Sequence, residues 1–294
     1  MITNCNFHPM NHRIYTESKL PQALSVSANS EKLASLACKI SEVAFSILSD
    51  ILILPGIGLL LIWMLLRPSF DPLFLKKDKV PILLLHGSGF NESQWIWGKF
   101  FLRNKDYGSI FSVSYDALIT NDPKKGIDDC AMGKVRDKIL QIQKLTGQAE
   151  IILIGHSMGG LIASYYAERL AKQDGTNIRH VISIASPWQG TPVIKQLLTK
   201  KHKEKRYLQM SPNNAFREKL IQDALHSEKT GKRTYYTIGS KADLLVPFPG
   251  SHLSGDLPHQ YTFSSLGHFG VVVFPQVWKQ IHLWLDKIYE PEVP

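Results

Sequence analysis

From Val80 onward, short apolar runs alternate with amphipathic segments, and this alternation constrains the fold more than any other feature of the chain. The runs that we interpret as strands are 80–86 (VPILLLH), 109–115 (SIFSVSY), 150–155 (EIILIG), 180–185 (HVISIA) and 234–239 (TYYTIG). They are apolar along most of their length rather than at every second position, which is typical of strands that are buried on both faces. We therefore expect a sheet with both of its faces covered.

Helix-like segments lie between these runs. In 126–145 the apolar residues recur at three- and four-residue steps; they are Ile127, Ala131, Val135, Ile139, Ile142 and Leu145. The segment after Gly159 and the segment 275–289 are also interpreted as helices. Strands that alternate with helices predict an α/β fold with a mostly parallel sheet. The 294 residues suit one catalytic domain, which we assign to 78–294, and an N-terminal appendage.

The appendage contains a polar region, 1–42, and a hydrophobic segment, 43–67. Its core, 51–66, carries no charge but is slightly shorter than the roughly 20 residues that span a bilayer, and the extended version includes Asp50. A single membrane span, a hairpin in one leaflet and a buried core or lid helix are all compatible with this pattern. Trp63 and the flanking lysines and arginine favour the two membrane interpretations, so we expect a membrane-associated protein.

The charge balance agrees with a membrane partner. The chain has 34 basic and 25 acidic residues, a net charge of +9, which favours anionic surfaces. Zinc-finger spacing, aromatic-basic stretches and arginine-rich arms are absent from the sequence, so we expect no nucleic-acid partner. The cysteines Cys5, Cys38 and Cys130 are too scattered for a disulfide framework or a zinc site, and we expect neither a metal nor a cofactor.

The segment Gly155-His156-Ser157-Met158-Gly159 follows one predicted strand and precedes an apolar helix-like segment. This order predicts a nucleophile elbow, in which a serine stands on a sharp strand-to-helix turn. Gly155 and Gly159 would relieve crowding at the turn, and Ser157 would be the nucleophile. His156 is interpreted as structural, pointing away from the serine hydroxyl.

A second glycine-containing loop, His86-Gly87-Ser88-Gly89, follows the first predicted strand about 70 residues before Ser157. Acyl transfer needs two N–H donors about 3 Å from the developing oxyanion. We assign them to the backbone of Ser88 and of Met158, the residue after the nucleophile.

The candidate base is His268, in the glycine-bounded loop SLGHFG before the terminal helix. His252, His259 and His282 lack these flanking residues and are weaker candidates. The acid should follow the run 234–239, where Asp243 stands, with Asp256 as the alternative. The chain order serine, acid, histidine is the order expected when a nucleophile elbow follows a strand of a parallel sheet.

With these pieces in place, the sequence resembles the α/β-hydrolase superfamily, and within it the bacterial triacylglycerol lipases and esterases. GHSMGG at 155–160, HGSG at 86–89, GSKADLLVP at 239–247 and SPWQGTP at 186–192 carry the likeness, which covers 80 to about 285. The resemblance implies an α/β-hydrolase fold with a cap insertion, at about 187–233, after the sixth strand of that fold. It maps the catalytic triad onto Ser157, Asp243 and His268, and the oxyanion hole onto Ser88 and Met158.

Two features depart from secreted lipases of this kind. An uncleaved apolar run replaces the usual leader, and no acidic cluster indicates a calcium site. In the cap, the charged stretch 200–206 is either a solvated face or a contact with anionic lipid.

The expected function is a serine carboxylic-ester hydrolase, a lipase or esterase that acts through an acyl-enzyme on a lipid or another apolar ester at a membrane. The same triad would serve an acyltransferase, and a non-catalytic membrane-bound scaffold with this fold is a further alternative.

Overall fold

The computed structural model describes residues 35, 36, 40, 41, 43–45, 47, 48, 50, 71, 72, 74–103, 105–115, 122, 124–193, 204–253 and 256–290. The chain divides into two compact units, residues 1–41 and 42–294. In the first unit, residues 35, 36, 40 and 41 are helical and exposed. The uncharged core 51–66 of the predicted hydrophobic segment lies outside the described residues. Among the residues that are described, no helix combines the length and the apolar character that crossing a membrane requires.

The second unit is built on a six-stranded sheet, in which every pairing is parallel. The strand order is β2-β1-β3-β4-β5-β6. The strands are β1 (Ile82–Leu85), β2 (Ile110–Val113), β3 (Ile152–His156), β4 (His180–Ile184), β5 (Thr234–Ser240) and β6 (Gln260–Phe263). The predicted α/β fold with a parallel sheet is therefore confirmed. Strand β6 was not predicted, because its four residues are polar or aromatic and only partly buried at the sheet edge.

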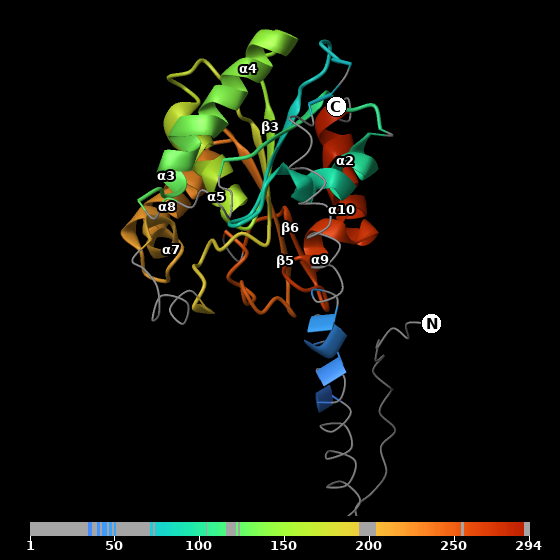
Figure 1. Cartoon of the computed structure of the whole chain (residues 1–294), viewed down its shortest axis with the longest axis vertical. Coiled ribbons are helices and arrows are strands. Elements are labelled where there is room, and N and C mark those ends of the chain that lie inside the picture. The colour runs from blue at the N-terminus through green and yellow to red at the C-terminus, as the bar shows by residue number, and fades with distance from the viewer. Residues whose placement is uncertain are drawn as a thin grey trace, which may run out of the picture. The chain divides into compact units, whose positions relative to one another are not determined.

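Helices cover both faces of this sheet (Figure 1). One face carries α3 (Ile127–Cys130), the π-helical turn η2 (Ala131–Val135), α4 (Arg136–Thr146), α5 (Met158–Tyr165), the π-helical turn η3 (Tyr166–Leu170) and α8 (Ala215–Lys229). The other carries α2 (Ile96–Leu102), preceded by the short η1 (Glu92–Trp95), together with α9 (Gly270–Val273) and α10 (Pro275–Tyr289). The predicted cap insertion between β4 and β5 contains α7 (Lys205–Gln209) and α8.

The single helix predicted at 126–145 is divided into α3, η2 and α4. Gly133 has φ −93° and ψ −119°, which are not helical values, and the helical pattern is interrupted there. A residue without a side chain adopts such a conformation at low cost. The apolar spacing continues across the irregular turn, which is why the pattern alone did not reveal it.

Strand β1 illustrates how the core is divided between the two faces. Leu83 and Leu85 pack with α3, α4 and α5, while Ile82 and Leu84 pack with α2 and α10. All four side chains are fully buried. Since every strand of the sheet is parallel, the carboxyl ends of β1, β3, β5 and β6 lie at one edge, where ligand sites of such sheets are found.

Candidate active site

Ser157 lies on the turn that joins β3 to α5. Its φ is +53°, a left-handed value that is strained for a residue with a side chain, and its N–H donates to the Ile184 carbonyl at 2.8 Å. The glycines on either side allow the close approach of the chain. A Cβ atom at Gly155 would lie 2.4 Å from the Gly159 backbone, and one at Gly159 would lie 2.3 Å from the Leu85 carbonyl oxygen. This local geometry holds the serine at the carboxyl edge of the sheet.

His268 and Asp243 are brought together by loops that follow β6 and β5. The Nδ1 atom of His268 lies 2.8 Å from the Oδ2 atom of Asp243, and both side chains are buried. The other carboxylate oxygen, Oδ1, accepts the N–H groups of Leu245 at 2.9 Å and Val246 at 2.8 Å. Since the ionised carboxylate accepts the Nδ1 proton, Nε2 of the neutral ring is left as an acceptor, the state that a general base requires.

Ser88 lies in the loop after β1, where Gly89 has φ +77°. The N–H of Gly87 donates to Gln94 Oε1 at 2.9 Å, and that of Phe90 donates to the Gly87 carbonyl at 3.3 Å. No hydrogen bond within the described part of the chain engages the N–H of Ser88 or that of Met158, the first residue of α5. These two donors are available to an oxygen atom beside Ser157.

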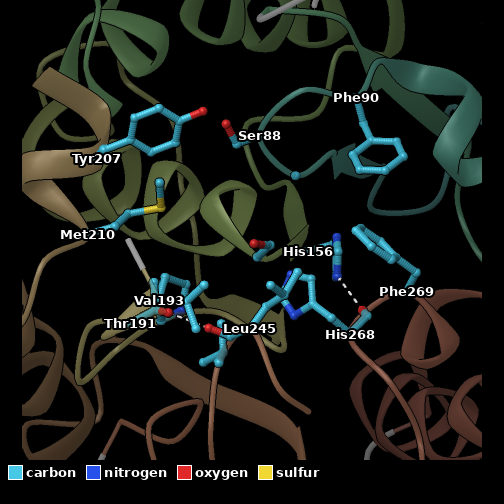
Figure 2. A pocket seen from close by; sticks show the side chains of 14 residues that line it. Ser88, Phe90, His156, Thr191, Val193, Tyr207, Met210, Leu245, His268 and Phe269 are labelled. Carbon is cyan, nitrogen blue, oxygen red and sulfur yellow. Dashed lines mark hydrogen bonds between the residues drawn. The ribbon is translucent and has the colours of Figure 1, made fainter. Parts of the chain in front are cut away.

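Ser157, His268, Ser88 and the other residues of this edge line one cavity of about 180 Å³. Its walls are mainly apolar (Figure 2): Phe90 and Phe269 lie on one side, and Tyr207 and Met210, from α7 and the residue after it, lie on the other. Val193 and Leu245 complete the apolar wall. Such a cavity suits an uncharged, largely hydrocarbon group next to the serine.

His156 has a more specific position than the sequence indicated. It is fully buried, its Nε2 lies 3.0 Å from the His268 carbonyl oxygen, and its Nδ1 lies 2.5 Å from Gln94 Nε2 (Figure 2 shows the first contact). Burial holds the pKa of His156 well below its usual range, so the ring is neutral. A neutral ring that donates from Nε2 and accepts at Nδ1 satisfies both partners.

Gln94, which the sequence analysis did not identify, completes this chain of contacts. Its amide group joins His156 to the Gly87 N–H, so the loop after β1 is linked through His156 to the backbone of His268. A glutamine in a short 3₁₀ turn has no sequence pattern that signals such a role. The only available signal was the position of His156 inside the elbow.

The alternative candidates have other surroundings. Both ring nitrogens of His252 face hydroxyl groups, Thr237 Oγ1 at 2.6 Å and Thr262 Oγ1 at 2.8 Å. His282 lies beside the Tyr107 hydroxyl at 2.9 Å, and His259 packs against the Tyr236 ring. Asp256 is exposed. Of the candidate acids, the structure pairs Asp243 with His268.

Cys130 is buried. Within the described ranges, no group of three or more histidine, cysteine, aspartate or glutamate side chains is arranged to hold a metal ion.

A sequence model of the alpha/beta hydrolase fold family matches residues 51–204, which is more than half of the chain. The chain belongs to the α/β-hydrolase fold family. No curated protein matches the sequence of this chain.

Solved structures of the same fold support the family assignment. A lipase of Bacillus licheniformis, BlEst2 in its mature form, superposes with a TM-score of 0.56 at 15% identity, covering 74% of this hydrolase and 96% of the lipase. A carboxylesterase structure from Nitrososphaera gargenis gives 0.53 at 12% identity, covering 76% and 96%. The lin2722 product of Listeria innocua gives 0.52 at 18% identity, covering 71% and 95%. At these identities the likeness shows the fold.

Proposed function

We propose that this hydrolase cleaves carboxylic esters through a covalent acyl-enzyme on Ser157, as a lipase or esterase does. The observation that carries the proposal is the hydrogen bond of Asp243 to His268, whose side chain lines the same cavity as Ser157. A buried carboxylate that fixes the tautomer of a histidine, next to a serine on a strained turn, is the arrangement that activates a hydroxyl group. The resemblance to a lipase and to a carboxylesterase in fold agrees with this chemistry.

The reaction would proceed in two steps. In the first, His268 Nε2 takes the hydroxyl proton of Ser157 as Oγ attacks the ester carbonyl carbon, and the N–H groups of Ser88 and Met158 hold the oxyanion. The tetrahedral intermediate collapses, and His268 gives the proton to the leaving alcohol. In the second step, His268 takes a proton from water as the water oxygen attacks the acyl carbon. The second tetrahedral intermediate then collapses, His268 returns the proton to Ser157 Oγ, and the acid is released.

The substrate that fits best is an ester with an apolar acyl group. The cavity walls next to Ser157 are hydrocarbon and aromatic groups, including Val193, Met210 and Leu245. The exposed side chains Leu208, Leu244 and Phe248 belong to the same cap and acid loops. An apolar surface of this kind favours a lipid or another water-insoluble ester over a charged substrate.

We further propose that the protein is membrane-associated and meets its substrate at a lipid surface. The uncharged run 51–66 and the net charge of +9 support this proposal, since apolar insertion and attraction to anionic lipid act together. Co-sedimentation of the full chain with neutral and with anionic vesicles tests it. Binding to neither kind of vesicle would contradict it.

Replacement of the nucleophile tests the proposed reaction. Ser157→Ala should lower the hydrolysis of nitrophenyl esters by a factor on the order of 10⁶, as in other serine enzymes, and should abolish labelling by a fluorophosphonate. Ser264→Ala, which changes an exposed serine after β6, is the matched control and should retain both. Unchanged ester hydrolysis in Ser157→Ala would end the proposal.

A series of nitrophenyl esters of increasing acyl length, assayed with and without vesicles, defines the acyl preference. Product analysis in the presence of a competing alcohol separates hydrolysis from acyl transfer. A protein with the triad residues intact that neither reacts with the fluorophosphonate nor turns over any ester would instead be a binding scaffold.

A further inference from the structure

The loop that carries His268 is contacted by a residue from the beginning of the second unit. Asp50 Oδ1 accepts the backbone N–H groups of Phe269 at 3.1 Å and Gly270 at 3.2 Å. On the other side of the histidine, a Cβ atom at Gly267 would lie 2.4 Å from the Asp50 carboxyl group. The half-buried carboxylate therefore lies against the backbone both before and after His268.

A second contact from the same segment reaches the other end of α9. Residues 43–45, 47, 48 and 50 are helical, and the Phe45 ring lies 6.3 Å from that of Phe274, the residue that ends α9. Asp50 caps the beginning of α9 and Phe45 packs at its end. The short helix behind His268 is thus held at both ends by residues more than 200 positions earlier in the sequence.

Within the described residues, His268 itself makes two hydrogen bonds. Asp243 holds its Nδ1 atom, and His156 holds its carbonyl oxygen. Neither contact involves the backbone N–H groups that follow the histidine, and α9 has no side-chain cap of its own from the adjacent residues. Asp50 supplies the missing restraint, since the first N–H groups of a helix need an acceptor and a carboxylate is a strong one.

We propose that Asp50 is a positioning residue for His268, so that the segment leading into the apolar run holds the catalytic base of the hydrolase in place. The inference rests on the proposed function of Ser157 and His268 and adds a role for a residue outside the triad. Since a misplacement of about 1 Å can reduce catalysis by a factor of about 100, a partial loosening of this loop should be visible in kcat.

The charge of Asp50 gives the proposal a second, independent readout. Among the described residues, the ionisable groups that act on Asp50 are His268 and Asp243. Burial raises the pKa of Asp50 and Asp243 adds to this, while the two backbone N–H groups and His268 oppose it. A carboxylate at this position interacts with positive charge that develops in the site during the reaction, so removing it should shift the acidic limb of the kcat/KM profile to lower pH.

The experiment uses the full chain, a short soluble nitrophenyl ester and a fluorophosphonate titration of active sites. Asp50→Ala removes both the cap and the charge and should lower kcat per titrated site about tenfold, with little change in KM. Asp50→Asn keeps an acceptor oxygen, so it should retain more of kcat but should show the same displacement of the acidic limb. Leu48→Ala, an exposed position on the same helical segment, should match the unmodified protein.

Gly267→Ala tests the contact between Asp50 and the His268 loop by changing the loop instead of the carboxylate. The added methyl group would displace the Asp50 carboxylate, so this variant should reproduce the loss seen in Asp50→Ala. Combined with Asp50→Ala it should add little, because two changes that break one interaction are not additive. Full additivity of the two losses would contradict a shared contact.

Two outcomes would overturn the inference while leaving the proposed function intact. One is unchanged kcat and an unchanged pH profile in Asp50→Ala when Ser157→Ala is inactive. The other is a loss of activity in Asp50→Ala that is fully explained by a smaller fraction of fluorophosphonate-titrated sites, with kcat per titrated site unchanged. That result would indicate unfolding of part of the protein rather than displacement of His268. Continued ester hydrolysis by Ser157→Ala would instead overturn the proposed function itself.

Discussion

The proposed nucleophile, Ser157, and the proposed base, His268, are held in different ways. Ser157 stands on a turn between consecutive elements, β3 and α5, and the glycines within two residues of it create the space that the turn needs. His268 lies in a loop whose position depends on Asp243, His156 and Asp50, which are distant in sequence. The turn also contacts Ile184 and Leu85 of the neighbouring strands, but the two glycines that relieve its crowding are close to Ser157 in sequence. Each restraint on the His268 loop instead comes from a distant segment. The two regions should therefore respond differently to substitution.

The largest expected effect comes from the acid. Asp243→Asn removes the charge that holds the Nδ1 proton of His268, and kcat should fall by a factor of about 10⁴, or about 5.5 kcal/mol of activation free energy. Steady-state hydrolysis of a nitrophenyl ester measures it. Asp256→Asn, at the exposed alternative candidate, is the control and should retain full activity. Similar losses in the two variants would mean that the pairing seen here is not the functional one.

Next in size is an effect on folding at the elbow. Gly155→Ala places a methyl group 2.4 Å from backbone atoms of Gly159 and Gly160, which cannot move aside as a flexible side chain can. The free energy of unfolding should fall by about 3 kcal/mol, as measured by urea denaturation. Ser264→Ala, which changes an exposed side chain, should change stability far less. Equal stability of the two variants would argue against a sterically determined turn.

A smaller effect on stability and kcat is expected at the hydrogen bond between His156, in the elbow, and the backbone of His268. His156→Ala leaves the Gln94 amide and the His268 carbonyl buried without a partner, at a cost of about 1–3 kcal/mol, and it should also lower kcat by loosening the His268 loop. His252→Ala removes another buried histidine with two hydroxyl partners and should reduce stability alone. If both variants keep normal kcat, the contact between His156 and His268 has no positioning role.

The smallest effect is a pH dependence of stability. The pKa of His156 is held below its ordinary value by burial in the folded state, so below about pH 6.5 the unfolded chain binds a proton that the folded chain does not. Stability due to this group is complete above pH 6.5 and falls by up to about 1.4 kcal/mol per pH unit as the pH decreases. Urea denaturation between pH 7.5 and 5 should therefore show a shallower slope in His156→Gln. An identical slope in the two proteins would contradict the assignment.

The contrast between the two regions also explains which features of the fold and the site could be predicted from the sequence. The parallel sheet and the order of Ser157, Asp243 and His268 were accessible because apolar runs and glycine-bounded turns are local patterns. Strand β6, Gln94 and the contact of Asp50 were not, because each depends on partners more than 20 positions away in the chain. His156 was interpreted as merely structural, since a sequence does not show which carbonyl its ring will reach.

The cap is attached to the rest of the domain through α7. The Ile127 N–H donates to Gln209 Oε1 at 2.6 Å, and Lys205 Nζ lies 2.7 Å from Asp128 Oδ2. Tyr207 and Met210, which line the cavity, belong to this attached stretch, whereas Ser157, Asp243 and His268 belong to loops of the sheet. Under the proposed function, acyl preference and reaction rate would therefore depend on separate segments. Natural variation in the stretch 207–210 can adapt such a protein to new acyl groups without disturbing its chemistry.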